Sequence, residues 1–164
     1  MDSIDKFNKL SKTEFISIFG NIFEKTEWVA ERCYESKPYN NLDELVSKMM
    51  KIFENIEKER HLEILNSHPY LAVEKKLTED SKNEQKNSSL NQCTDEEFVE
   101  FKKLNDEYKK KFGFPFIIAV KEKNKEEFLN SFRQRITNNI NLEFEEAKKQ
   151  VKKIANFRLS EIIK

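Results

Sequence analysis

Apolar residues recur every three or four positions along most of this chain, which is the spacing of helices that bury one face. The clearest pattern covers residues 94–112, where Thr94 or Asp95 can cap the first turn. Its apolar side is formed by Phe98, Phe101, Leu104 and Tyr108. Similar patterns predict helices over residues 15–23, 27–36, 42–53, 59–68, 125–137 and 141–163. We therefore predict one compact all-α domain of about eight helices, spanning residues 1–164.

One stretch interrupts the helical pattern: KFGFPFIIAV, residues 111–120. The chain has only two glycines and three prolines, and one of each falls here. Gly113 is expected to end the preceding helix, because glycine adopts the left-handed cap conformation at little cost. Pro115 then prevents the helix from resuming. Residues 114–120 should therefore form an extended, buried segment between two helices.

The main-chain groups of such a segment need partners from outside it. Without a helix, its buried N–H and C=O groups must form hydrogen bonds elsewhere. Neighbouring loops or water could supply the partners. Alternatively, the main chain could hold a polar ligand, and the composition of the segment leaves both interpretations open.

Charge and composition narrow the function classes. Lys plus Arg and Asp plus Glu each total 30, so the formal net charge is zero, which argues against nucleic acid as the main partner. Charged residues make up 37% of the chain and alternate in sign, as solvated helix faces do. Fourteen phenylalanines indicate a packed core and exclude a disordered chain.

The chain shows no sign of export or membrane insertion. Cys33 and Cys93 lie far apart and form no CxxC pair, which favours a reduced, cytosolic protein. The first residues lack the basic and apolar regions of a signal peptide, and no apolar run approaches the roughly 20 residues of a membrane span. We therefore expect a cytoplasmic protein.

Two histidines are candidates for acid–base chemistry. His61 lies among charged residues and is expected at the surface. His68 follows apolar residues, precedes Pro69 and lies at a helix break, so it could be a boundary residue or a general acid or base. Metal-binding motifs such as HExxH, a Cys–His set or EF-hand spacing are missing, and so are GxSxG and a Gly-rich phosphate loop.

Two further groups combine polar residues in an unusual way. In SKNEQ, Ser81 lies at helical spacing from Glu84 and Gln85, which also fits a simple capping box. In the last helix, Arg158 shares a face with Ala147, Val151, Ile154, Ala155 and Ile162. A guanidinium on this apolar stripe either extends to the solvent or holds a carboxylate or a ureido carbonyl.

These pieces follow one another as EKTEWVAER, SHPYLA, LTEDSKNEQ, NDEYKKKFGFPFIIAV and IANFRL. That order resembles the OHCU decarboxylases, enzymes of urate breakdown that act on 2-oxo-4-hydroxy-4-carboxy-5-ureidoimidazoline. The resemblance extends over about residues 7–163. Its specificity comes from HPxLA, SxxEQ and FGFPF at matching separations, since each motif alone is weak.

The resemblance implies an all-α homodimer that needs no cofactor and no metal. It assigns the catalytic roles to His68 as acid/base, to Glu84 and to Arg158. It assigns the substrate contacts to Pro69, Ser81, Gln85 and the main chain of Phe116, Ile117, Ile118, Ala119 and Val120. In this interpretation Gly113 and Pro115 break the helix so that free main-chain groups can line a pocket.

The chain departs from the family pattern at two places. The family usually has Ala-Gly shortly after EQ, where this chain has Ser88 and Ser89, a change that concerns the local turn rather than the chemistry. The stretch between HPYLA and SKNEQ is also shorter than in many relatives, which changes how Glu84 can approach His68.

The implied reaction is a decarboxylation followed by stereospecific protonation to S-allantoin. The substrate carries its carboxylate beside a ring C=N, so electrons released with carbon dioxide can enter the imine without a cofactor. His68 would transfer the protons and Glu84 would orient it, although the two roles could be exchanged. The alternatives are a non-catalytic helical interaction module, or the same fold acting on another small ureido acid.

Overall fold

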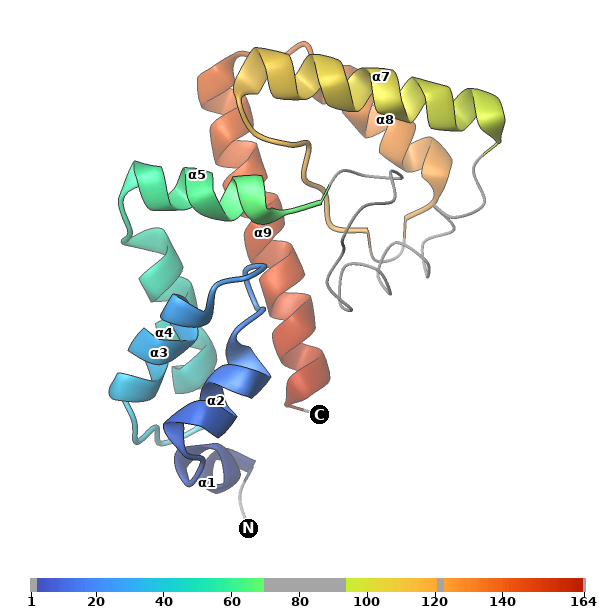
Figure 1. The fold of residues 1–164 in the computed structure, drawn as a ribbon. Coiled ribbons are helices and arrows are strands. Elements are labelled where there is room, and N and C mark those ends of the chain that lie inside the picture. The colour runs from blue at the N-terminus through green and yellow to red at the C-terminus, as the bar shows by residue number, and fades with distance from the viewer. Residues whose placement is uncertain (1–2, 70–93, 121–122, 164) are drawn as a thin grey trace. The chain divides into compact units, whose positions relative to one another are not determined.

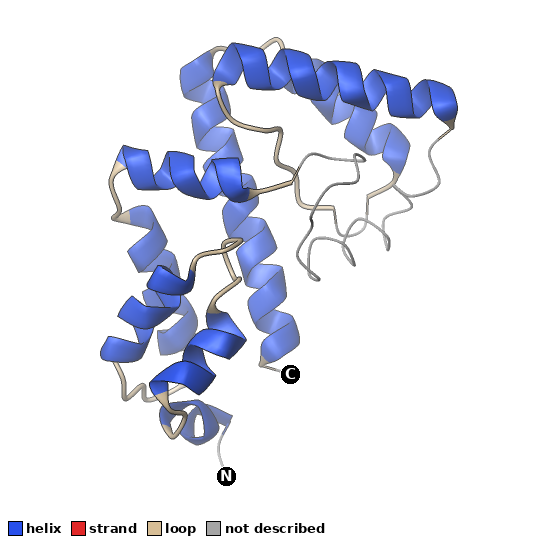
Figure 2. Ribbon diagram, viewed as in Figure 1, coloured by secondary structure: helices blue, strands red, loops and turns tan. Residues whose placement is uncertain are grey.

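The computed structural model describes residues 3–69, 94–120 and 123–163. These residues form eight helices and no strand, which confirms the predicted all-α class (Figures 1 and 2). None of these described helices is long and apolar enough to cross a membrane.

The chain divides into two compact units, Met1–Ile64 with Lys152–Lys164, and Leu65–Val151. Their union in the single domain expected over residues 1–164 stays a prediction. The first unit holds α1 (Ser3–Asn8), α2 (Lys12–Phe19), α3 (Glu27–Glu35) and α4 (Leu42–Glu54). The second holds α7 (Asp95–Phe112) and α8 (Lys125–Arg135), while α5 (Lys58–Ser67) and α9 (Ile140–Ile162) contribute residues to both.

The first unit is organised by the packing of α2 on α3 and of α3 on α4. A capping box starts α2, since the Ser11 hydroxyl accepts from the Glu14 N–H at 3.2 Å and the Glu14 carboxylate accepts from the Ser11 N–H. Gly20 follows the last residue of α2, and its N–H donates to the Ile16 carbonyl at 2.7 Å. A Cβ at this position would lie 2.6 Å from that carbonyl oxygen, so the close approach favours glycine. Its core contains the fully buried rings of Phe15, Phe19, Phe23 and Phe53.

The second unit is built around α7, which contacts α8. Thr94 and Glu97 form a capping box at the start of α7, so the predicted Thr94 cap is confirmed. Acidic residues fill its first turn and three lysines its last, and both arrangements stabilise the helix dipole. Phe101, Leu104 and Tyr108 are buried as predicted, but Phe98 is 42% exposed, so the buried face begins one turn later.

Candidate functional site

The segment that interrupts the helical pattern is formed as its glycine and proline predict. Gly113 follows the last residue of α7 with φ 82°, in the left-handed region, and its N–H donates to the Lys109 carbonyl at 2.8 Å. Pro115 supplies no N–H, and residues 115–120 belong to no helix, strand or turn. Phe114 to Ile118 are all buried. The predicted burial of this connection is therefore confirmed for residues 114–118, while Ala119 and Val120 are half-buried.

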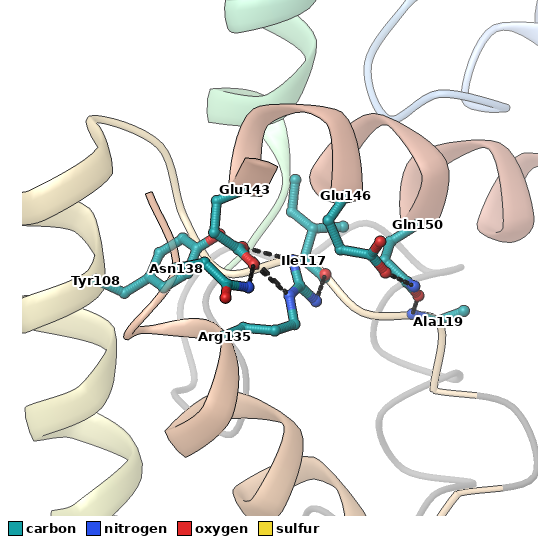
Figure 3. Close-up of polar contacts among 8 residues, drawn as sticks. All are labelled: Tyr108, Ile117, Ala119, Arg135, Asn138, Glu143, Glu146 and Gln150. Carbon is teal, nitrogen blue, oxygen red and sulfur yellow. Dashed lines mark hydrogen bonds and ion pairs between the residues drawn. The ribbon is translucent and has the colours of Figure 1, made fainter. Parts of the chain in front are cut away.

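Side chains from α8 and α9 bind one edge of this segment (Figure 3). The Arg135 guanidinium donates through Nη1 to the Ile117 carbonyl at 2.7 Å. The Ala119 N–H donates to Oε1 of Gln150 at 3.0 Å. Buried protein side chains are thus the partners of these two groups, an arrangement that the sequence interpretation did not include.

These two bonds involve residues two positions apart, Ile117 and Ala119, which indicates that segment 114–120 has a second edge. In extended backbone, the N–H and C=O of one residue point to the same side, and those of the next residue point to the other. The Ile117 C=O and the Ala119 N–H point toward Arg135 and Gln150, and in an extended segment we expect the groups of Ile118 to point to the other side. Among the described residues, the main-chain groups of Phe116 and Ile118 form no hydrogen bond. The geometry leaves an edge whose donors and acceptors can bind a polar molecule.

Arg135 is itself fixed by the carboxylate of Glu143, in the first turn of α9. Its Nε lies 3.1 and 3.2 Å from the two carboxylate oxygens of Glu143, and Nη2 lies 3.0 Å from one of them. Glu143 also accepts from the Tyr108 hydroxyl and from Asn138 at 3.1 Å. The guanidinium lies 4.4 Å from the centre of the Phe116 ring. Every polar atom of the carboxylate is therefore satisfied, as a buried charge requires.

Burial raises the pKa of Tyr108 above its ordinary value, and the hydrogen bond to Glu143 raises it further. The hydroxyl therefore stays protonated and donates to the carboxylate. A neutral donor lets Glu143 keep its ion pair with Arg135 without a second buried positive charge.

The sequence held a signal for this cluster. Ala147 and Val151 were assigned to the apolar stripe of the last helix. Counting back four residues from Ala147 gives Glu143, and counting three forward gives Gln150, so both polar residues lie on the buried side. A carboxylate and an amide on an apolar stripe predict buried polar partners, as Arg158 did.

His68 lies where the sequence placed it, directly after the last residue of α5 and before Pro69. The residue is 7% exposed, and its main-chain N–H donates to the Leu65 carbonyl at 3.3 Å. Pro69 is half-buried.

His61 was expected at the surface, and that expectation is wrong. It is 5% exposed, Nε2 lies 2.7 Å from the Phe53 carbonyl oxygen, and the imidazole packs edge-on against the Phe53 ring. The charged neighbours in the sequence point elsewhere because a helix presents consecutive residues on different faces. His61 is a structural residue that connects α5 to the end of α4.

Arg158 is buried, 4% exposed, so it does not extend to the solvent. Its Nη2 donates to the carboxylate of Glu24 at 2.8 Å and its Nη1 to the Asn21 carbonyl at 2.7 Å. Glu24 has φ 68° and Lys25 φ 53°, both in the left-handed region. The anionic partner that the sequence required exists within the protein, on a turn that neither Glu24 nor Lys25 adopts without strain.

The remaining predicted site residues lie outside the described residues. These are Ser81, Glu84 and Gln85, together with the departure at Ser88 and Ser89. His68 and Arg158 belong to different units. The meeting of His68, Glu84 and Arg158 in one site therefore stays a prediction. Among the residues that the structure describes, no group of three or more His, Cys, Asp or Glu side chains could hold a metal ion.

Known proteins match this chain over almost its whole length. It is 40% identical, over 100% of its own length, to a uric acid degradation bifunctional protein from a Bacillus species, of which it spans 33%. It is 34% identical to the 2-oxo-4-hydroxy-4-carboxy-5-ureidoimidazoline decarboxylase of Haloferax volcanii, over 97% of this chain and 95% of that protein.

Solved structures share the fold. The crystal structure of (S)-allantoin synthase matches with a TM-score of 0.80 and 28% identity, over 100% of this chain and 54% of that chain. An OHCU decarboxylase crystallised in the presence of (S)-allantoin matches with a TM-score of 0.75 and 23% identity, over 88% of this chain and 96% of that chain. The family model for OHCU decarboxylase matches residues 8–160. This chain therefore belongs to the OHCU decarboxylase family.

Proposed function

We propose that this protein is a carboxy-lyase of urate degradation that converts 2-oxo-4-hydroxy-4-carboxy-5-ureidoimidazoline to (S)-allantoin without a cofactor. The observation that carries the proposal is the family match over residues 8–160. It favours an enzyme over a non-catalytic helical module, and this substrate over another small ureido acid. A homodimer in the cytoplasm is part of the same proposal.

The substrate contains its own electron sink. Its carboxylate and hydroxyl share a carbon next to the ring C=N, so breaking the carbon–carboxylate bond sends the electron pair toward the imine. The product is an enol that must become a ketone while the neighbouring carbon gains a proton. In water both faces of that carbon are open, so the enzyme has to accelerate the reaction and select one face.

In the proposed mechanism His68 carries the proton, either taking it from the hydroxyl or giving it to carbon. Glu84 orients His68 or binds the hydroxyl. Arg158 binds the anionic or ureido end of the substrate, while Glu24 and Asn21 hold the guanidinium from behind. Positioned proton transfer is typically worth about 10²–10⁴-fold in rate.

The remaining predicted residues bind the polar edges of the substrate ring. In this proposal Ser81, Gln85 and Pro69 contact the substrate. Within the main chain of residues 116–120, the groups of Phe116 and Ile118 bind the ring and ureido groups, because the Ile117 C=O and the Ala119 N–H are already bonded to Arg135 and Gln150.

Chiral detection of the allantoin made from freshly generated substrate tests the proposal. The wild type should yield one enantiomer, and His68→Ala should lose about 10²-fold or more in rate together with the enantiomeric excess. His61→Ala is the matched control, since it removes the other buried imidazole and should leave turnover per folded molecule unchanged. Turnover of His68→Ala at wild-type speed would contradict the assignment.

A further inference from the structure

We propose that Gln150 and Arg135 are positioning residues of the reaction, which hold one edge of segment 114–120 so that the opposite edge, at Ile118, is fixed for the substrate. The inference rests on the proposed function, because it names how that site is kept in shape. Neither residue needs to touch the substrate.

The two anchors come from different helices and grip the segment two residues apart. Arg135, the last residue of α8, binds the Ile117 carbonyl, and Gln150 of α9 binds the Ala119 N–H. Two bonds on one edge, one accepting and one donating, fix both the rotation and the register of the residue between them. The direction of the Ile118 N–H and C=O is therefore set by α8 and α9.

Gln150 can act in only one orientation. Its Nε2 donates to Glu146 Oε1 at 2.9 Å, one turn earlier in α9, which leaves Oε1 to accept from Ala119 (Figure 3). Gln150 is 5% exposed, so water does not substitute easily for either partner. The amide thus joins a carboxylate to a backbone donor. A side chain at position 150 with only acceptors or only donors could not make both bonds while position 146 remains a glutamate.

The anchor at Arg135 is equally determined. Three contacts to Glu143 fix the plane of the guanidinium, and the Phe116 ring below it stacks on Phe132 with centroids 3.9 Å apart. The ring and the carbonyl of neighbouring residues are therefore held by one side chain. A site supported this closely keeps its geometry without ligand, and looseness of about 1 Å is enough to lose function in such sites.

The test uses Gln150→Met, which keeps the length of the side chain and removes its hydrogen-bonding groups. KM for freshly generated substrate should rise about five- to tenfold, as loss of one hydrogen bond predicts, with kcat changed less than twofold. A residue that only stabilised the fold would lower the active fraction and hence the apparent kcat, and would leave KM unchanged. Lys149→Met is the matched control, because Lys149 is an exposed neighbour on the same helix.

Rescue by exchange sharpens the test. The double variant Glu146→Gln with Gln150→Glu swaps donor and acceptor along α9 but again offers Ala119 an oxygen, so it should restore KM to within about twofold of wild type. An unchanged KM in Gln150→Met, or no recovery in the exchanged pair, would overturn the inference. The proposed function would still stand in that case, provided that the wild type turns over the substrate. A wild type that released no allantoin would overturn the proposed function and this inference with it.

Discussion

Among the described residues, each unit contains one buried arginine–glutamate pair, and the two pairs lie on different backbone conformations. Arg135 and Glu143 in the second unit have side chains 10% and 0% exposed, and Arg158 and Glu24 in the first have 4% and 1%. The Arg135–Glu143 pair joins the end of α8 to the first turn of α9. The Arg158–Glu24 pair joins α9 to a turn in which Glu24 has φ 68°.

The two pairs differ in whether the backbone conformation of their residues favours or opposes the ion pair. Arg135 at a helix C-terminus and Glu143 at a helix N-terminus are both favoured by the helix dipoles, so their backbone assists the charges. Glu24 adopts the left-handed region, which opposes a residue with a Cβ. The Arg135–Glu143 pair, which holds segment 114–120, is thus free of backbone strain. The pair that includes a predicted catalytic residue stores strain, which is typical of functional sites.

Breaking the Arg135–Glu143 pair should have the largest effect on stability. Glu143→Leu leaves the Arg135 guanidinium buried without its carboxylate, so the free energy of unfolding should fall by about 3–5 kcal/mol. The double variant Arg135→Met with Glu143→Leu should recover part of that loss, because no buried charge remains. Urea unfolding of the two variants measures the difference, and a double variant no more stable than Glu143→Leu would contradict the account.

Removing the neutral donor of the same pair should cost less and should change the response to pH. Tyr108→Phe deletes a hydrogen bond to a charged group, so the free energy of unfolding should fall by about 2 kcal/mol at pH 7. The pKa of Tyr108 is raised in the folded protein, so its contribution is complete below pH about 10, where an unfolded tyrosine ionises, and is lost as pH rises further.

The variant should therefore lose less stability than the wild type between pH 8 and pH 11, as urea midpoints would show. Tyr39, whose pKa is also raised by burial, is present in both proteins and cancels in the comparison. Parallel curves for wild type and Tyr108→Phe would reject the role of the hydroxyl.

The smallest expected effect is a difference in stability between glycine and alanine variants, and its sign should be opposite at Glu143 and at Glu24. At position 143, within a helix, glycine should be less stable than alanine by about 0.5–1 kcal/mol. At position 24, glycine should be more stable than alanine by about 1 kcal/mol, since only glycine adopts a positive φ freely. Thermal unfolding of the four variants gives the signs, and the same order at both positions would disprove the difference in backbone strain.

The fold was largely predictable because the helices follow local rules. The stop at Gly113 and Pro115 and the cap at Thr94 depend on residues next to one another, and they lie as predicted. The partners of buried charges were not predictable in the same way. Glu24 precedes Arg158 by 134 residues, and nothing in the local pattern around EKTE indicates a buried carboxylate.

The site was predictable in part, for a related reason. Arg158 was recognised because it interrupts an apolar stripe, and Glu143 and Gln150 carry the same signal, each about one turn away from Ala147. His61 was misplaced because its charged neighbours occupy other faces of α5. A stripe counted over the whole of α9 would have recovered Gln150, and Glu143 as the partner of Arg135.

The claim that segment 114–120 uses one edge for the fold and the other for the ligand is tested most directly by backbone amide exchange. Rates at Ile118 and Ala119 would be measured by NMR with and without saturating (S)-allantoin. Ala119, which donates to Gln150, should exchange slowly and equally in both samples, while exchange at Ile118 should slow at least tenfold with the ligand. An unchanged rate at Ile118, or protection gained at Ala119 alone, would contradict the account.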